Sequence, residues 1–106
     1  MAGASPTSLT LRKLREDGYT AEVVERWNPH ARIRQDLFGF VDVLAVRAGE
    51  TLAVQTTSAT NVSSRIHKIA DSPNIAIVRE AGWTIRVHGW AKIKGRWVLK
   101  RDEDVS

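Results

Sequence analysis

Two polar side chains stand inside stretches that are otherwise apolar enough to form the core of a small protein. Asp42 lies within FGFVDVLAV, and Gln55 lies within LAVQTTS. A buried carboxylate is costly unless a cation or hydrogen bonds compensate it. Carboxylate and amide oxygens are ligands that Mg²⁺ takes, and a divalent cation can neutralise the charge that develops when a phosphodiester is hydrolysed. The pair therefore indicates a candidate metal site, with a strand-edge carboxylate and a backbone-satisfying amide as the alternatives.

Basic side chains elsewhere in the sequence could hold the phosphates of such a substrate. Arg65 and Lys68 are three residues apart, so they lie close together on the helix predicted there. No acidic residue lies between Glu80 and Asp102, where Lys and Arg residues are interleaved with tryptophans. A basic stretch suits a polyanion, because contacts to phosphates release condensed counterions. A solvated outer face of a hairpin would carry the same residues.

The first third of the chain predicts a helix, a strand and a loop. Ser5 and Pro6 are typical of an N-cap and a first helical position, and Gly18 is typical of the residue that ends a helix. Residues 19–27, YTAEVVERW, are β-branched and aromatic enough to form a strand. Residues 30–37, HARIRQDL, are polar and basic and predict a connecting loop.

The two polar interruptions belong to the next predicted elements, a pair of strands joined by a turn at residues 48–50. Side chains alternate between the two faces of a strand, so Asp42 shares a face with Phe40. By the same rule Gln55 shares a face with Thr57. Two adjacent strands can place the aspartate and a second oxygen ligand on one face of a sheet, within reach of one metal ion.

Helical signals follow this strand pair. Apolar residues recur at i, i+4 and i+7 over residues 62–69, which predicts a helix capped by Thr60 or Asn61. Ser72 and a following proline repeat the N-terminal signal and predict a short helix that ends before Gly82. The core of the protein is thus expected to include one or two helices between its third and fourth strands.

The remaining residues predict a strand pair over residues 83–101, with a turn at Lys94 and Gly95, and a frayed acidic tail at residues 102–106. The order is helix, three strands, one or two helices and two strands, which predicts an α/β fold with a mixed central sheet flanked by helices. A length of 106 residues predicts one domain over the whole chain, with its core at about residues 7–101.

Several function classes leave no signature in the sequence. There is no cysteine, which excludes disulfides and thiolate metal sites. The histidines at positions 30, 67 and 88 have no metal-ligand spacing, so no zinc site is expected. No GxSxG, P-loop or GxGxxG motif occurs. Neither a signal peptide nor the ~18 apolar residues needed to cross a bilayer are found, so we expect a cytoplasmic location.

Three stretches together resemble a known family: DLFGFVDVLA, LAVQTTS and NVSSRIHKI. With the order of elements, they resemble the PD-(D/E)xK nucleases, which have the restriction-endonuclease-like fold, and in particular small phage nucleases and Holliday-junction resolvases. The resemblance covers roughly residues 7–101. It implies an αβββαββ core, a Mg²⁺- or Mn²⁺-dependent endonuclease that cuts DNA, including branched DNA, and a homodimer in a bacterial or phage-infected host.

The resemblance also implies roles for individual residues. Asp42 matches the metal-binding aspartate of the motif, Gln55 its second acidic position and Thr57 its lysine. Gln55 offers an oxygen but no charge, and Thr57 offers no ammonium group. Lys68, or Arg65 beside it, could take the place of that lysine.

The acidic residue that the family carries in its first helix has no clear counterpart here. Glu25 is its best replacement, followed by Asp36. The predicted catalytic set is therefore Asp42, Gln55, Glu25, Thr57 and Lys68, with Asp42, Gln55 and Glu25 as metal ligands. The predicted nucleic-acid contacts are Arg65, Lys68, Arg32, Arg34, Lys92, Lys94 and Arg96.

Two other functions stay open. The amide at Gln55 and the hydroxyl at Thr57 would also fit a DNA-binding or assembly module that kept the fold and lost the chemistry. A protein-interaction domain that uses the tryptophan-bearing hairpin is the third possibility. The tryptophans could stack on bases, although core packing is their commoner role in a chain of this length.

Overall fold

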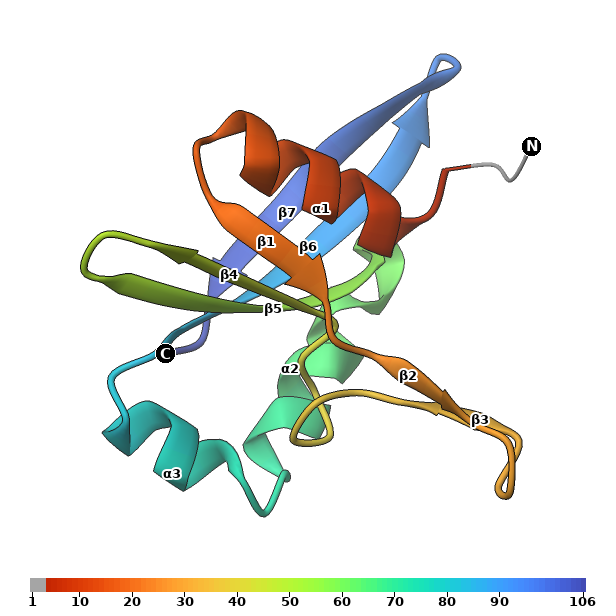
Figure 1. Cartoon of the computed structure of the whole chain (residues 1–106). Coiled ribbons are helices and arrows are strands. Elements are labelled where there is room, and N and C mark those ends of the chain that lie inside the picture. Colours follow the sequence, from red (N-terminus) through yellow and green to blue (C-terminus); the bar gives the residue numbers. More distant parts are fainter. Residues whose placement is uncertain (1–3) are drawn as a thin grey trace.

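A five-stranded mixed sheet forms the centre of the protein in the computed structural model, which describes residues 4–106 (Figure 1). Its strand order is β1-β4-β5-β6-β7. Only β5 and β6 run parallel; the other neighbours are antiparallel. The strands are β1 (Thr20–Val23), β4 (Val43–Arg47), β5 (Glu50–Ser58), β6 (Thr84–Ile93) and β7 (Arg96–Asp104). The predicted α/β class with a mixed, helix-flanked sheet is confirmed.

Helix α1 (Pro6–Glu16) covers one face of the sheet and begins and ends where the sequence predicts. The Ser5 hydroxyl accepts a hydrogen bond from the backbone N–H of Ser8, and Pro6 occupies the first turn. Gly18 has a φ of +94° just beyond the helix, a conformation that glycine adopts without strain. Leu14 packs with apolar residues of β1, β4 and β5 beneath the helix.

The opposite face is covered by α2 (Val62–Ala70), which a short 3₁₀ turn (Ala59–Asn61) precedes, and by α3 (Ile75–Glu80). Asn61 is the N-cap of α2, as predicted. Because β5 alternates, Leu52 and Val54 face α1 while Ala53 belongs to the cluster under α2 and α3. Gln55 follows the Ala53 face, and this places it on the side of α2.

The sequence prediction is wrong for residues 19–37. The expected single strand divides into β1 and β2 (Arg26–Asn28), and the expected loop contains a third strand, β3 (Ile33–Gln35). β2 and β3 pair antiparallel as a separate hairpin, which extends away from the main sheet at the lower right of Figure 1. Nearly all its residues are exposed, so neither strand has the apolar alternation that identifies half-buried strands.

Three further boundaries differ from the prediction. α3 begins at Ile75 with Asn74 as its N-cap, and not at the signal of Ser72 and Pro73. Residues 37–41 form a turn rather than the start of a strand, with Phe38 and Gly39 at positive φ and the N–H of Leu37 bonded to the carbonyl of Val41. Residues 102–106 are not a frayed tail. β7 continues to Asp104, and the Ser106 hydroxyl accepts a hydrogen bond of 2.8 Å from the backbone of Ile85. Among the described residues, no helix has both the length and the apolar composition that a membrane crossing requires.

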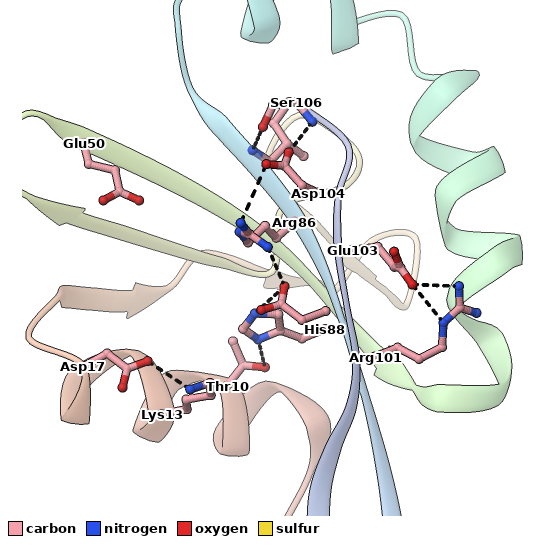
Figure 2. A network of polar contacts seen from close by, with 12 residues as sticks. Thr10, Lys13, Asp17, Glu50, Arg86, His88, Arg101, Glu103, Asp104 and Ser106 are labelled. Carbon is pink, nitrogen blue, oxygen red and sulfur yellow. Dashed lines mark hydrogen bonds and ion pairs between the residues drawn. The ribbon is translucent and has the colours of Figure 1, made fainter.

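A polar network links α1 to β6 and β7 through His88, whose side chain is buried (Figure 2). The Trp90 indole donates a 2.9 Å hydrogen bond to the Thr10 hydroxyl, which lies 3.2 Å from Nδ1 of His88. Nε2 of His88 lies 3.5 Å from Asp102, and Arg86 donates to the same carboxylate. His88 thus joins α1 to the two C-terminal strands from a buried position.

Candidate metal centre

Three carboxylates converge at the base of the β2–β3 hairpin. One oxygen from each of Glu25, Asp36 and Asp42 lies within 4.8 Å of the other two. Glu25 directly precedes β2 and Asp36 directly follows β3, so the pairing of Arg26 with Gln35 brings the two acidic residues side by side. The hairpin that the sequence did not reveal is therefore what assembles the cluster.

Asp42 is fixed in place by backbone hydrogen bonds on both sides. Its N–H donates to the carbonyl of Val54 on β5, and its carbonyl accepts from the N–H of Val24, next to Glu25. The side chain is held as firmly, because Oδ2 accepts hydrogen bonds from Gln55 Nε2 at 2.7 Å, from the Thr56 N–H at 2.8 Å and from the Thr56 hydroxyl at 3.2 Å. None of the described residues donates to Oδ1, which leaves this oxygen available to a cation.

Gln55 presents an oxygen that has no hydrogen-bond partner among the described residues. Its side chain is only 2% exposed, and its Oε1 is fully buried. An unsatisfied buried acceptor is costly, and native proteins contain few of them. Gln55 lines the same pocket as the three carboxylates, so a cation bound there would satisfy the amide oxygen and the acidic cluster together.

The surroundings of Asp42 strongly change the acidity of its carboxyl group. Burial, and after it hydrogen bonding to Asp36 and Glu25, raises the pKa of Asp42 to about 8, while the N–H of Thr56 acts in the opposite direction. A carboxyl group with this pKa is largely protonated at neutral pH when no cation is bound. A divalent cation would reverse the effect, because it stabilises the charged form of every carboxylate it contacts.

Basic side chains surround the acidic cluster in a pocket of about 270 Å³. Lys68 forms an ion pair of 3.1 Å with Asp36, and Arg34 forms one of 3.3 Å with Glu25. Arg65 also lines the pocket and forms no ion pair with any described residue. The complete lining is Thr7, Glu25, Arg34, Asp36, Asp42, Gln55, Thr56, Arg65 and Lys68. Cations on the rim and carboxylates at the centre are the arrangement that a metal bound to a phosphate would require.

The structure brings together most, but not all, of the predicted site residues. Those in the pocket are Asp42, Gln55, Glu25, Lys68, Arg65 and Arg34. Asp36, predicted as a substitute for Glu25, lies beside it, so both contribute. Arg32 lies near the tip of the β2–β3 hairpin, and Lys92, Lys94 and Arg96 lie at the tip of the β6–β7 hairpin, outside this pocket.

Thr57 lies outside the pocket although Gln55, two residues earlier, lines it. Thr57 pairs with Gly89 of β6, and a side chain at Gly89 would collide with Val62 at the start of α2. The helix therefore packs directly on the sheet at this point and covers the position that resembles the family's lysine. Lys68, which lies further along α2, lines the pocket instead.

Thr56 and Thr7 contribute to the site without having been predicted. Alternation along β5 places Thr56 on the face opposite to Gln55, yet its N–H and hydroxyl both reach Asp42. The Thr7 hydroxyl lies 2.8 Å from that of Thr56 and ties the first turn of α1 to the site. No local pattern marks Thr7, because only the packing of α1 on the sheet brings it there.

The donor set decides which metals fit. It consists of carboxylate and amide oxygens, without histidine or cysteine in the pocket, and such oxygens suit Mg²⁺ or Mn²⁺ rather than zinc or copper. An acidic cluster that is capped by arginine and lysine could thus bind a divalent cation and an anionic ligand at once. No family model and no curated protein matches the chain. The chemistry of the site therefore has to be inferred from these residues and their geometry.

Proposed function

We propose that this protein is a Mg²⁺- or Mn²⁺-dependent endonuclease that hydrolyses phosphodiester bonds in DNA, with a divergent active site of the PD-(D/E)xK type. The observation that carries the proposal is the meeting of Glu25, Asp36 and Asp42 in one pocket that Gln55 also lines, with the buried Gln55 Oε1 lacking a partner among the described residues. Isolated acidic clusters are common on protein surfaces, but a buried and unsatisfied Gln55 Oε1 beside one calls for a cation.

The residues of the pocket divide the work in the proposed reaction. A divalent cation would be held by oxygens of Asp42, Glu25, Asp36 and Gln55, and it would supply Lewis-acid stabilisation and a more acidic water molecule. Thr56 and the Gln55 amide keep the Asp42 carboxylate oriented through Oδ2.

Two basic residues on α2 would handle the substrate. Arg65 makes no ion pair with any described residue, so its guanidinium can hold a phosphate beside the cluster. Lys68 is paired with Asp36, and its ammonium group stands where it can move to a phosphate oxygen once a cation has taken over that carboxylate.

Other features support DNA as the substrate and a paired assembly. The tip of the β6–β7 hairpin carries Lys92, Lys94 and Arg96, which would extend contacts to the backbone of a long polyanion. This tip and the β2–β3 hairpin project from the body in different directions (Figure 1). Cutting both strands of a duplex or branch takes two sites, and we therefore propose that the protein acts as a homodimer.

A second candidate function is a DNA-binding or assembly module without catalysis. It is favoured by the amide at Gln55 and by the burial of Thr57 where the family has its lysine. In that case the acidic pocket would stabilise the fold on binding a cation but would cleave nothing.

Cleavage of DNA by the purified protein separates the two candidates. Labelled linear, flapped and four-way-branched DNA would be incubated with Mg²⁺, Mn²⁺ or EDTA. We expect cleavage with either cation, none with EDTA and none by Asp42→Asn. Glu80→Ala, which removes an exposed carboxylate on α3, is the matched control and should cleave like the wild type. Cleavage by Asp42→Asn at the wild-type rate, or cleavage in EDTA, would refute the proposed site.

A further inference from the structure

The β2–β3 hairpin carries an exposed tryptophan beside the acidic pocket. Trp27 is 56% exposed, whereas Trp97 on the other hairpin is 38% exposed and Trp90 is buried. A large aromatic surface left in water is costly to maintain, and such residues often mark a binding surface. We therefore expect a ligand to cover the ring of Trp27.

The pairing of the hairpin places Trp27 on the side of the pocket. Trp27 is directly opposite Arg34, and residues that face each other in an antiparallel pair project from the same face. Arg34 reaches into the pocket and donates a 3.3 Å hydrogen bond to Glu25. The side chain of Arg34 thus lies between the indole of Trp27 and the acidic cluster. Ile33, which is 51% exposed on the same hairpin, pairs with Asn28 one position away and so projects from the other face.

A hollow next to the indole has room for a flat ring. It has a volume of about 330 Å³ and is lined in part by Arg26, Trp27, Pro29 and His30. The hollow is formed by the hairpin alone, because every residue that lines it belongs to β2, its turn or β3. Arg26 and Gln35, which also line the hollow, alternate with Trp27 and Arg34 and project from the other face of the hairpin, so the hollow places a guanidinium group beside the edge of the indole.

The charge of the hairpin decides between nucleic acid and a second copy of the chain. Residues 26–35 contain Arg26, Arg32 and Arg34 and no acidic residue. In a symmetric dimer made through this hairpin the same patch would face itself, so arginines would face arginines. A nucleic acid offers phosphates to the arginines and a base to the indole, and base–aromatic stacking is tolerant of sequence.

We propose that Trp27 stacks on an unpaired base of a single-stranded DNA segment while Arg34 directs the adjoining phosphate toward the acidic pocket. A base inside a continuous duplex has both faces covered by its neighbours and cannot offer one to the indole. This inference rests on the proposed nuclease function for its cleavage prediction. It follows that the enzyme prefers DNA that has unpaired nucleotides next to the scissile phosphate, such as flaps and branches.

Binding in EDTA, which keeps the DNA intact, tests the stacking directly. Fluorescence anisotropy of a labelled single-stranded oligonucleotide and of a fully paired duplex would be measured for the wild type, Trp27→Ala, Trp27→Phe and Ile33→Ala. We expect Trp27→Ala to weaken single-strand binding about tenfold, the loss expected for one stacked base, and to leave duplex binding nearly unchanged. Trp27→Phe should recover most of the affinity, and Ile33→Ala should bind like the wild type. Indole emission should be quenched on binding in the wild type.

Each other outcome contradicts the inference. Equal losses for both kinds of DNA, no loss at all, or a loss shared by Ile33→Ala would show that Trp27 is no stacking platform. Loss of a dimer by Trp27→Ala in sedimentation velocity would assign the hairpin to a contact between copies instead.

Failure of the stacking and failure of the nuclease proposal give different results. If the wild type cleaves linear duplex and flapped DNA equally well and Trp27→Ala does not change this, the stacking is wrong and the nuclease stands. If single-strand binding depends on Trp27 but no divalent cation supports cleavage, the nuclease proposal is wrong and the stacking stands.

Discussion

Gln55 donates a 2.7 Å hydrogen bond from Nε2 to Oδ2 of Asp42, and its other amide atom, Oε1, is buried and has no partner within residues 4–106. The two side chains meet where the β4–β5 ladder ends: its last pair is Val43 with Val54, and the N–H of Asp42 donates to the carbonyl of Val54, next to Gln55. The bond orients the carboxylate, and it turns the amide oxygen into an acceptor that only a cation or water can satisfy.

Gln55→Glu tests whether this position belongs to the metal site. The variant adds a fourth carboxyl group to the cluster, so we expect it to unfold at a lower temperature than the wild type in EDTA. Because a further negative ligand strengthens Mg²⁺ binding, the rise in Tm on adding Mg²⁺ should be larger than for the wild type. Thermal unfolding followed by circular dichroism measures both.

Gln55→Leu is the control for the same position. It removes the hydrogen bond to Asp42, which we expect to cost about 1–3 kcal/mol of unfolding free energy. It also removes the amide oxygen, so Mg²⁺ should raise its Tm less than that of the wild type. Equal Mg²⁺ shifts in all three proteins would exclude Gln55 from the site.

The contribution of Asp42 to the stability of the cation-free protein should fall as the pH rises from about 4 to about 8. The pKa of Asp42 is about 8 in the folded protein against 3.8 in the unfolded chain, so the folded state holds a proton over this range that the unfolded state has lost. The slope for one proton is at most about 1.4 kcal/mol per pH unit. Urea unfolding in EDTA measures it. We expect Asp42→Asn to lack this slope and saturating Mg²⁺ to reduce it; an unchanged slope in the variant would contradict the assignment.

The network around His88 predicts a loss of stability at the acidic end of the pH range. Burial lowers the pKa of His88 below its usual 6.5, against the opposing charge of Asp102, so the unfolded chain takes up a proton that the folded protein resists. The contribution of His88 to stability should therefore fall as the pH drops below about 6.5, opposite in sign to the contribution of Asp42. His88→Gln should lose this slope whatever its stability at neutral pH, and Thr10→Val, which leaves the imidazole in place, should keep it. Urea unfolding of the three proteins between pH 5 and 8 checks this, and a slope retained by His88→Gln would assign it elsewhere.

The location of the site could be predicted from the sequence because it depends on local exceptions to a strong rule. Asp42 and Gln55 interrupt apolar runs that must be buried, and burying a polar group needs a physical reason. The helix boundaries at Ser5 and Gly18 follow equally local rules for capping and turns.

The parts that could not be predicted depend on contacts between distant residues or on exposed backbone pairing. The strands around Trp27 and Ile33 bury almost nothing, so no periodicity reveals them, and without their hairpin the nearness of Glu25 and Asp36 has no visible cause. The sequence predicts a frayed tail for the acidic residues after Arg101, because their ion-pair partners, among them Arg86, lie on another strand. The sequence does not reveal that Thr57 lies outside the pocket, because the helix packing that covers Thr57 depends on its sheet neighbour Gly89, far along the chain.

Arg65 and Lys68 lie three residues apart on α2, but replacing each by alanine should have different effects. Lys68 is paired with Asp36, so Lys68→Ala removes a partly exposed ion pair from the acidic cluster. We expect a loss of at most about 1 kcal/mol in EDTA and a larger Tm increase with Mg²⁺, because the cation no longer competes with the ammonium group.

Arg65→Ala breaks no ion pair within the part of the chain that the structure describes, so its Tm should match that of the wild type with and without Mg²⁺. If its guanidinium contacts a phosphate, DNA affinity should fall and the slope of log K against log salt should decrease by about 1. The slope is obtained from anisotropy titrations in EDTA at several salt concentrations. Equal Mg²⁺ shifts in Lys68→Ala and the wild type would show that Lys68 does not compete for the cluster. An unchanged salt slope in Arg65→Ala would remove this residue from the DNA contact.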